Sequence, residues 1–553
     1  MSRGPRQRSR TLLLAAGLAV ATLLGQAYAG GAAAARPAAG LPVHGGTLHV
    51  AYSGSMQTFD PAQAFNDDWW AMNGTLFNAL YRLDRHGKPV LDLAAAPPTV
   101  SADRKVWTFK LRHGVRFSNG QELTAEDLRF SITRTLDPNL KPAPSWGQTT
   151  DEIFEGAAAF ASGKAKTVPG IQVLDRYTIR FKLVQPVSVL PYILAETFNF
   201  ALPESVVTKM SESDFADRPV GTGPFEIVSW HKGSQIVFKR NPYYFRTGKP
   251  YVDKLIIDTN VPANLIALRV QSGEIDGSGN GSELAAADIE QARKDPRFAK
   301  YLVQGPIVWL SWLNLNVHAA PLDNPTLRRA IAMAINRQKL VRFLGGLAAP
   351  TGNLYIPIYP QNDPRLDRSP VYPYDPAKAA ALVKTSGYKG QAITLLYPAD
   401  FGYNAGEATG IQQDLQRIGL NVQLRPSTTT SLTQLGTKFT GHQLSIFNWS
   451  PDYPDGYDVY VSEFSCAVNA EGGISRAHYC DPTADALVDK ASVMPLGAAR
   501  DSLLRQAQLR ILQSAAYVPL VYNLTVAMVN PRVQGFYYHP MYGWQYEDYW
   551  LKS

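Results

Sequence analysis

The sequence predicts a protein of the α/β class with mixed sheets, built from two to four domains. With 553 residues, the chain is too long to form only one ordinary hydrophobic core, since a domain usually contains roughly 100–200 residues. Strand-like alternation dominates before about residue 300, and helix-then-strand units follow. No repeat of fixed period is present. We therefore expect a mixed α+β portion followed by a separate α/β portion.

The N-terminus has the layout of a secretory signal peptide over residues 1–29. Four arginines precede the apolar stretch Leu12–Leu24, and Ala27-Tyr28-Ala29 supplies the small residues of a cleavage site. An uncleaved membrane anchor is the alternative, but the stretch is shorter than the ~20 residues that a spanning helix needs. We expect cleavage near Ala29, a flexible linker over 30–43 and a periplasmic protein. No cysteine lies nearby, so no lipid anchor is expected.

Charge and cysteine content exclude some classes of protein. Removal of residues 1–29 takes away four of the 54 lysines and arginines and none of the 46 acidic residues. The remaining excess of positive charge is small and dispersed, so it does not indicate nucleic-acid binding. Cys466 and Cys480 are the only cysteines, and such a close pair is typical of a disulfide in an oxidising compartment. Zinc is the competing interpretation, but His478 alone does not complete a ligand set. We expect no metal or cofactor.

Short elements can be placed along the first portion. A strand begins at Thr47, and Val106–Phe117 is predicted to form two strands joined by a glycine turn. Thr124–Asp127 resembles a capping box, with Asp in place of the usual Glu, and predicts the start of a helix. Arg176–Lys182 alternates as another strand. The glycines and prolines of Pro219–Phe225 predict a tight turn that feeds a β-hairpin.

The later portion contains helix starts and a helix-strand unit. Asn324-Pro325 and Asp375-Pro376 each supply an N-cap and a first-turn proline, and the first of these helices is expected to reach about Phe343. A third helix over Glu407–Ile418 precedes a strand over Leu420–Leu424. Strand, helix and strand in close succession predict a partly parallel sheet that helices cover.

A series of short segments matches one protein family in order and spacing. The segments are Phe59–Ala62, Leu76–Asp84, Trp107–Gly120, Leu123–Asp127, Gly221–Phe225, Leu313–Asn316, Pro321–Asn324, Leu327–Asn336, Trp449–Asp455 and Tyr479–Pro482. Together they resemble the extracellular solute-binding proteins of the dipeptide and oligopeptide type, family 5, which are the capture subunits of ABC importers.

The resemblance implies a periplasmic-binding-protein fold with two lobes, a hinge and the ligand between the lobes. The first lobe would comprise 44–305, with an extra α+β subdomain over about 85–210. The second lobe would comprise 306–515, and 516–553 would return to the first. The resemblance also implies a monomer without catalytic activity, which delivers a peptide to a membrane permease and ATPase complex.

The resemblance implies an amine anchor at Asp452. In peptide-binding relatives, the aspartate of a Trp-x-x-Asp-Tyr motif takes the α-ammonium group of the ligand, and a carboxylate suits a cation that is shielded from water. The alternative is that Asp452 and Asp455 are only turn residues between prolines. Trp449 and Tyr453 would supply apolar walls of the site or belong to the core.

Further ligand contacts are implied in both lobes. Tyr403 and Asn404 lie where relatives place groups of the second lobe, and Phe65, Asn66 and Trp69 lie where the first lobe approaches the cleft. The loop that starts at Phe65 lacks the small residues typical of dipeptide binders. The length and class of the peptide therefore stay open.

Two alternative functions remain. Members of the same family bind nickel complexes, haem, oligosaccharides or opine-like compounds, although a nickel site would want a histidine beside Asp452 or Tyr403 and the sequence has none there. A secreted hydrolase is more remote, because Gly-x-Ser-x-Gly and His-Glu-x-x-His motifs are absent. Gly156–Lys164 and Gly277–Gly281 also lack the spacing of nucleotide-binding loops.

Overall fold

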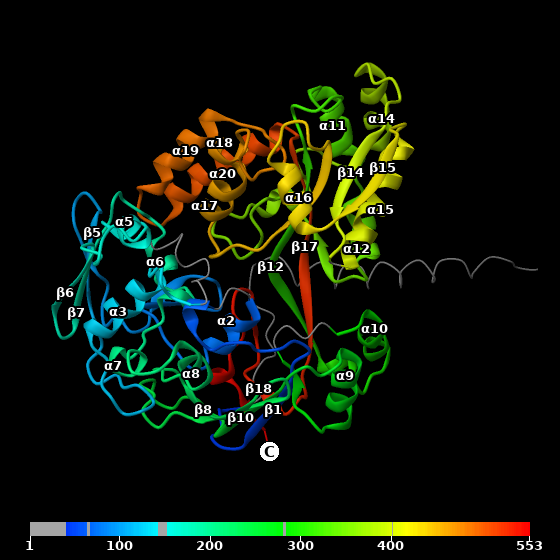
Figure 1. Cartoon of the computed structure of the whole chain (residues 1–553). Helices are drawn as coiled ribbons and strands as arrows, with labels where there is room; N and C mark the ends of the chain where they lie inside the picture. Colours follow the sequence, from blue (N-terminus) through cyan, green and yellow to red (C-terminus); the bar gives the residue numbers. More distant parts are fainter. Residues whose placement is uncertain (1–39, 64–66, 142–151, 280–283, 401, 553) are drawn as a thin grey trace, which may run out of the picture.

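Two large sheets organise the chain (Figure 1). The computed structural model describes residues 40–63, 67–141, 152–279, 284–400 and 402–552. The first lobe is built around a five-stranded sheet in the order β11 (Gly277–Ser278), β1 (Thr47–Ala51), β10 (Lys254–Asp258), β9 (Gln235–Arg240) and β8 (Phe225–His231). The second lobe is built around a six-stranded sheet in the order β13 (Ala348–Pro350), β17 (Tyr517–Met528), β12 (Leu302–Leu315), β16 (Leu444–Trp449), β14 (Ile393–Pro398) and β15 (Val422–Ser427).

The predicted turn and hairpin of the first lobe are confirmed. Strands β8 and β9 pair antiparallel, from Phe225 opposite Arg240. A Cβ on Gly221 would lie 2.0 Å from the carbonyl oxygen of Leu76, and one on Gly223 would lie 2.4 Å from its carbonyl carbon. Only glycine lets this turn lie so close to the neighbouring backbone.

A four-stranded antiparallel sheet forms a subdomain of the first lobe. Its order is β4 (Thr99–Val100), β5 (Val106–Lys110), β7 (Thr178–Lys182) and β6 (Ile171–Asp175). Helix α3 (Ala125–Thr135) begins as predicted, because the backbone N–H of Thr124 donates to Asp127 Oδ2 at 2.9 Å. The second strand predicted within 106–117 was wrong. Instead, Phe117 N donates to Gln121 O at 2.8 Å, which folds the chain into a tight loop.

Helices cover the six-stranded sheet, and the predicted parallel pairing is confirmed, since β14 is parallel to both β15 and β16. The helices are α11 (Pro325–Ala334), α12 (Arg337–Phe343), α14 (Pro376–Thr385) and α15 (Gly402–Arg417). The single helix predicted from Pro325 to about Phe343 is in fact two. Asn336 starts a new helix by accepting the N–H of Lys339 at 3.0 Å, while its own N–H donates to Asp414 at 2.9 Å.

Two long strands connect the lobes. Strands β12 and β17 pair antiparallel from Leu302 opposite Met528 to Asn314 opposite Tyr517, with irregular register after Pro306 and after Ser311. Figure 1 shows both strands running from the lower to the upper part of the molecule. The lobe boundaries near residues 305 and 515 stay predictions.

The helices that follow β16 share a cluster of buried hydrophobic side chains with residues of the first lobe. They are α17 (Gly456–Val459), α18 (Cys466–Asn469), α19 (Pro482–Ser492) and α20 (Ala498–Gln513). One cluster of buried side chains includes Leu504 and Val488 of these helices together with Leu190 and Phe198 of the first lobe. A second cluster lies between the six-stranded sheet and its covering helices. The segment between β16 and α17 therefore lies where the two lobes meet.

The predictions for the N-terminus lie almost entirely outside the described residues. These are the signal peptide over 1–29 and the linker over 30–43, of which only residues 40–43 are described. Within the described ranges, no helix combines the length and the apolar character needed to cross a bilayer.

Candidate ligand-binding site

The predicted amine anchor lies in the loop between β16 and α17. Asp452 is partly buried, and burial raises the pKa of its carboxyl group to about 6. Its backbone N–H donates to Oδ2 of Asp458 at 3.1 Å. Among the described residues, neither carboxylate has a lysine, arginine or histidine within salt-bridge distance. Within the described part of the chain, no cationic side chain neutralises the pair.

Asp455 has a structural role in the same loop. It is buried and forms a bidentate ion pair with Arg500, at 2.8 Å from Nη1 to Oδ2 and 2.8 Å from Nη2 to Oδ1. It also caps α17 by accepting the N–H of Tyr457 at 2.9 Å. The Nε of Arg500 donates to Ser188 Oγ of the first lobe at 3.0 Å. This network fixes the loop that carries Asp452.

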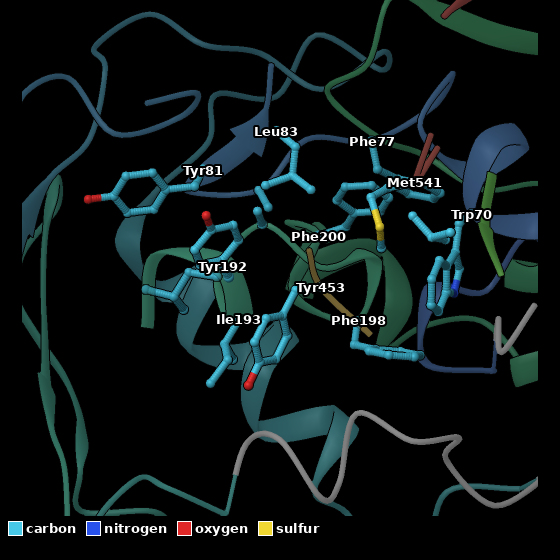
Figure 2. Close-up of a cluster of buried hydrophobic side chains, with 14 of the residues drawn as sticks. Trp70, Phe77, Tyr81, Leu83, Tyr192, Ile193, Phe198, Phe200, Tyr453 and Met541 are labelled. Atoms are coloured by element: carbon cyan, nitrogen blue, oxygen red, sulfur yellow. The ribbon is translucent and has the colours of Figure 1, made fainter. Parts of the chain in front are cut away.

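Tyr453 packs against the first lobe. Its side chain is buried, and its ring stacks on that of Tyr192 in α6 (Leu190–Ile193), with the centroids 5.8 Å apart. Figure 2 shows Tyr453 among Tyr192, Ile193 and Phe198 of the first lobe. Because Tyr453 follows Asp452 directly, the anchor loop touches both lobes.

Trp449 and Asn404 lie at neighbouring ends of the second-lobe sheet. Trp449 is partly buried, and its indole Nε1 is shielded from solvent without a hydrogen-bond partner among the described residues. Asn404 is fully buried: its Nδ2 donates to Pro398 O at 3.0 Å, and its Oδ1 accepts from Asn448 Nδ2 at 3.0 Å. Asn404 therefore ties the start of α15 to the ends of β14 and β16.

The other predicted contacts are placed only in part. Trp69 belongs to α2 (Asp67–Asn73), is buried and donates from Nε1 to Ser55 O at 3.3 Å. Tyr403 belongs to the first turn of α15, but its side chain is outside the described part. Phe65 and Asn66 also lie outside the described residues. Whether these residues touch a ligand stays a prediction.

A buried acid on α15 was not predicted from the sequence. Glu407 is fully buried and accepts a hydrogen bond from Ser311 Oγ of β12 at 2.8 Å, and burial raises the pKa of its carboxyl group to about 7. The helical spacing of Asn404, Glu407 and Ile411 is the signal that could have placed it on the buried face.

We expect Glu407→Gln to stabilise the protein at and above neutral pH. The folded pKa of Glu407 lies above its unfolded value, so its stabilising contribution is complete below about pH 4.5 and is lost as the pH rises through about 7. The amide keeps the volume and can still accept from Ser311. The gain in unfolding free energy over wild type should grow with pH to about 2–3 kcal/mol. Urea unfolding at several pH values measures it, with the exposed Glu290→Gln as control, and a pH-independent difference would contradict the expectation.

The predicted disulfide is confirmed, since Cys466 and Cys480 are bonded with their Cα atoms 4.4 Å apart. It closes the segment that runs from α18 to the start of α19.

We expect the Cys466→Ser/Cys480→Ser variant to lose about 3 kcal/mol of unfolding free energy, the value for a loop of about 15 residues. Guanidinium unfolding measures the loss. A reductant should destabilise wild type by a similar amount and leave the variant unchanged; equal sensitivity of both proteins would refute this.

The described residues also contain a cavity inside the first lobe. Its volume is about 60 Å³, and Trp70, Phe200, Arg246 and Trp544 are among its lining residues. None of the predicted ligand contacts lines it. No group of three or more potential metal ligands is present among the described residues.

Comparison with known proteins places the chain in a family. The family model of bacterial extracellular solute-binding proteins, family 5, matches residues 88–471. The chain belongs to this family. It is 27% identical to the di/tripeptide-binding protein 2 of Pseudomonas aeruginosa, over 90% of this chain and 93% of that protein.

Solved structures agree with this membership. The clavulanic acid biosynthesis oligopeptide binding protein 2 superposes with a TM-score of 0.83 at 22% identity, covering 95% of this chain and all of that one. The periplasmic binding protein DppA of Helicobacter pylori, in complex with the peptide STSA, has a TM-score of 0.70 at 25% identity and covers 92% of this chain and 99% of its own. The predicted periplasmic-binding-protein fold is therefore confirmed.

Proposed function

We propose that this family 5 protein captures peptides in the periplasm for an ABC importer and binds their N-terminal ammonium group through Asp452. The observation that carries the proposal is a carboxylate that has no cationic partner among the described residues, in a loop that touches both lobes. A peptide ammonium group would supply the missing charge. The peptide names of the relatives support this choice of ligand.

Binding would couple to the movement of the lobes. The proposed first lobe comprises 44–305 and 516–553, and the proposed second lobe comprises 306–515. A ligand shifts the balance between open and closed forms only by its higher affinity for the closed form. Tyr453 packs on Tyr192, so the Asp452 loop already contacts the first lobe. Closure would bring further first-lobe groups to this loop. The proposed protein acts as a monomer, hands its peptide to a membrane permease and does not alter it chemically.

The test is calorimetric titration of the mature protein with di-, tri- and pentapeptides and with their N-acetylated forms. We expect free peptides to bind and acetylated peptides to bind much more weakly, because acetylation removes the cation that Asp452 pairs with. Absence of binding to every peptide would reject the peptide function. Equal binding of free and blocked peptides would reject Asp452 as the amine anchor.

A further inference from the structure

A second carboxylate lies directly beside the proposed amine anchor. Asp458 is 3% exposed, and the contact that fixes it is the backbone N–H of Asp452, which donates to its Oδ2 at 3.1 Å. The anchor loop therefore folds back so that the carboxylate of Asp458 binds the backbone of Asp452, six residues earlier. The sequence analysis did not single out Asp458, because its distance from Asp452 depends on the turn between them.

Among the residues that the structure describes, the surrounding groups do not neutralise the pair. The charged or titratable groups that act on it or share its environment are Asp455, Arg500, Tyr359, Tyr453 and Tyr457. Arg500 is bound in bidentate fashion to Asp455. The phenols of Tyr359, Tyr453 and Tyr457 are largely buried, and burial raises the pKa of each, so all three are neutral at physiological pH.

Two like charges, one buried and one partly buried, are costly without a counter-ion, and none is present among the described residues, so a pair of this kind retains a proton. Burial, and then the charge of Asp452, raise the pKa of Asp458 well above its usual value. Trp449 favours the ionised form of Asp458, and its indole Nε1 is shielded from solvent. Burial and mutual repulsion therefore favour retention of one proton by the pair.

We propose that Asp458 is the second carboxylate of the amine site, and that the Asp452–Asp458 pair exchanges its shared proton for the ammonium group of the ligand. This inference rests on the proposed function. The incoming R–NH₃⁺ keeps all of its protons, and the proton of the pair leaves to solvent. Binding therefore releases up to one proton, and affinity rises with pH until the pair is ionised without ligand.

The primary experiment needs no variant. Trialanine, or whichever alanine peptide of two to five residues binds, is titrated calorimetrically into the mature protein in two buffers of different ionisation enthalpy. We expect release of about 0.5–1 proton per peptide near pH 7. The dissociation constant should fall by up to about tenfold per pH unit as the pH rises toward the pKa of the peptide amine, about 8. Tight binding without proton release, and without this pH dependence, would overturn the proposal.

The variant Asp458→Asn tests the role of the second carboxylate separately from that of the anchor Asp452. The amide oxygen can still accept the N–H of Asp452, so the loop is retained, but the single remaining acid is mostly ionised at neutral pH. We expect peptide binding with little proton release and a flat affinity between pH 7 and the pKa of the peptide amine, about 8. Asp375→Asn is the control, because this exposed N-cap also accepts a backbone N–H, from Lys378 at 2.9 Å, and it should behave as wild type.

The possible failures are distinguishable. If no peptide binds to wild type, the proposed function fails. If peptides bind and depend on their free amine but release no proton, only the role of Asp458 fails. Persistent release of about one proton by Asp458→Asn would likewise overturn that role.

Discussion

Arg500→Met is expected to lower the free energy of unfolding by about 3–5 kcal/mol, because it leaves the Asp455 carboxylate buried without its counter-ion. Arg500 is 0% exposed and Asp455 is 1% exposed, so water cannot replace the lost partner. The Ser188 hydroxyl also loses the donor that links it to α20. Methionine preserves much of the side-chain volume, so the loss reports mainly on charge and hydrogen bonding.

Urea unfolding of the mature protein measures this effect. Arg505→Met is the matched control, since Arg505 lies on the same helix and makes one exposed hydrogen bond to Pro360 O at 3.3 Å. Its effect should stay within about 0.5 kcal/mol. A double variant, Asp455→Leu/Arg500→Met, should be more stable than the sum of the single losses implies, because no charge is left buried. Additive losses would show that the two side chains act independently.

Local signals in the sequence were sufficient for most elements. The start of α3 at Thr124 and the start of α11 at Asn324 depend on side chains within three residues, and both form as expected. The break at Asn336 was missed because its backbone N–H is bound by Asp414, which lies 78 residues further along the chain. Helix boundaries fail where a distant partner decides them.

The candidate site shows the same division between local and distant information. A sequence motif singled out Asp452 as the proposed anchor, but no spacing rule could show that Arg500 neutralises Asp455 from 45 residues away. The contact of Arg500 with Ser188 spans 312 residues. The sequence therefore supplied the proposed anchor, and tertiary contacts distinguish it from Asp455, since Asp452 has no cationic partner among the described residues.

Asp452→Asn is expected to weaken binding of a free peptide by about 100-fold or more, corresponding to about 3 kcal/mol. The amide has the shape of the carboxylate but no charge, so the ammonium group of the ligand would keep only Asp458, which is more deeply buried and whose pKa burial raises well above its usual value. Calorimetric titration at neutral pH measures the change. Asp489→Asn is the control, because Asp489 is an exposed acid on nearby α19 and its loss changes the net charge equally.

The decisive comparison combines this variant with N-acetylated peptide. If Asp452 pairs with the ammonium group, acetylation and Asp452→Asn remove the same interaction, so their effects cannot add. Wild type should discriminate strongly between free and acetylated peptide, whereas Asp452→Asn should bind both with similar, low affinity. Full discrimination by the variant would mean that another group binds the amine. Equal and tight binding of both peptides by wild type would mean that recognition depends on the peptide backbone and side chains.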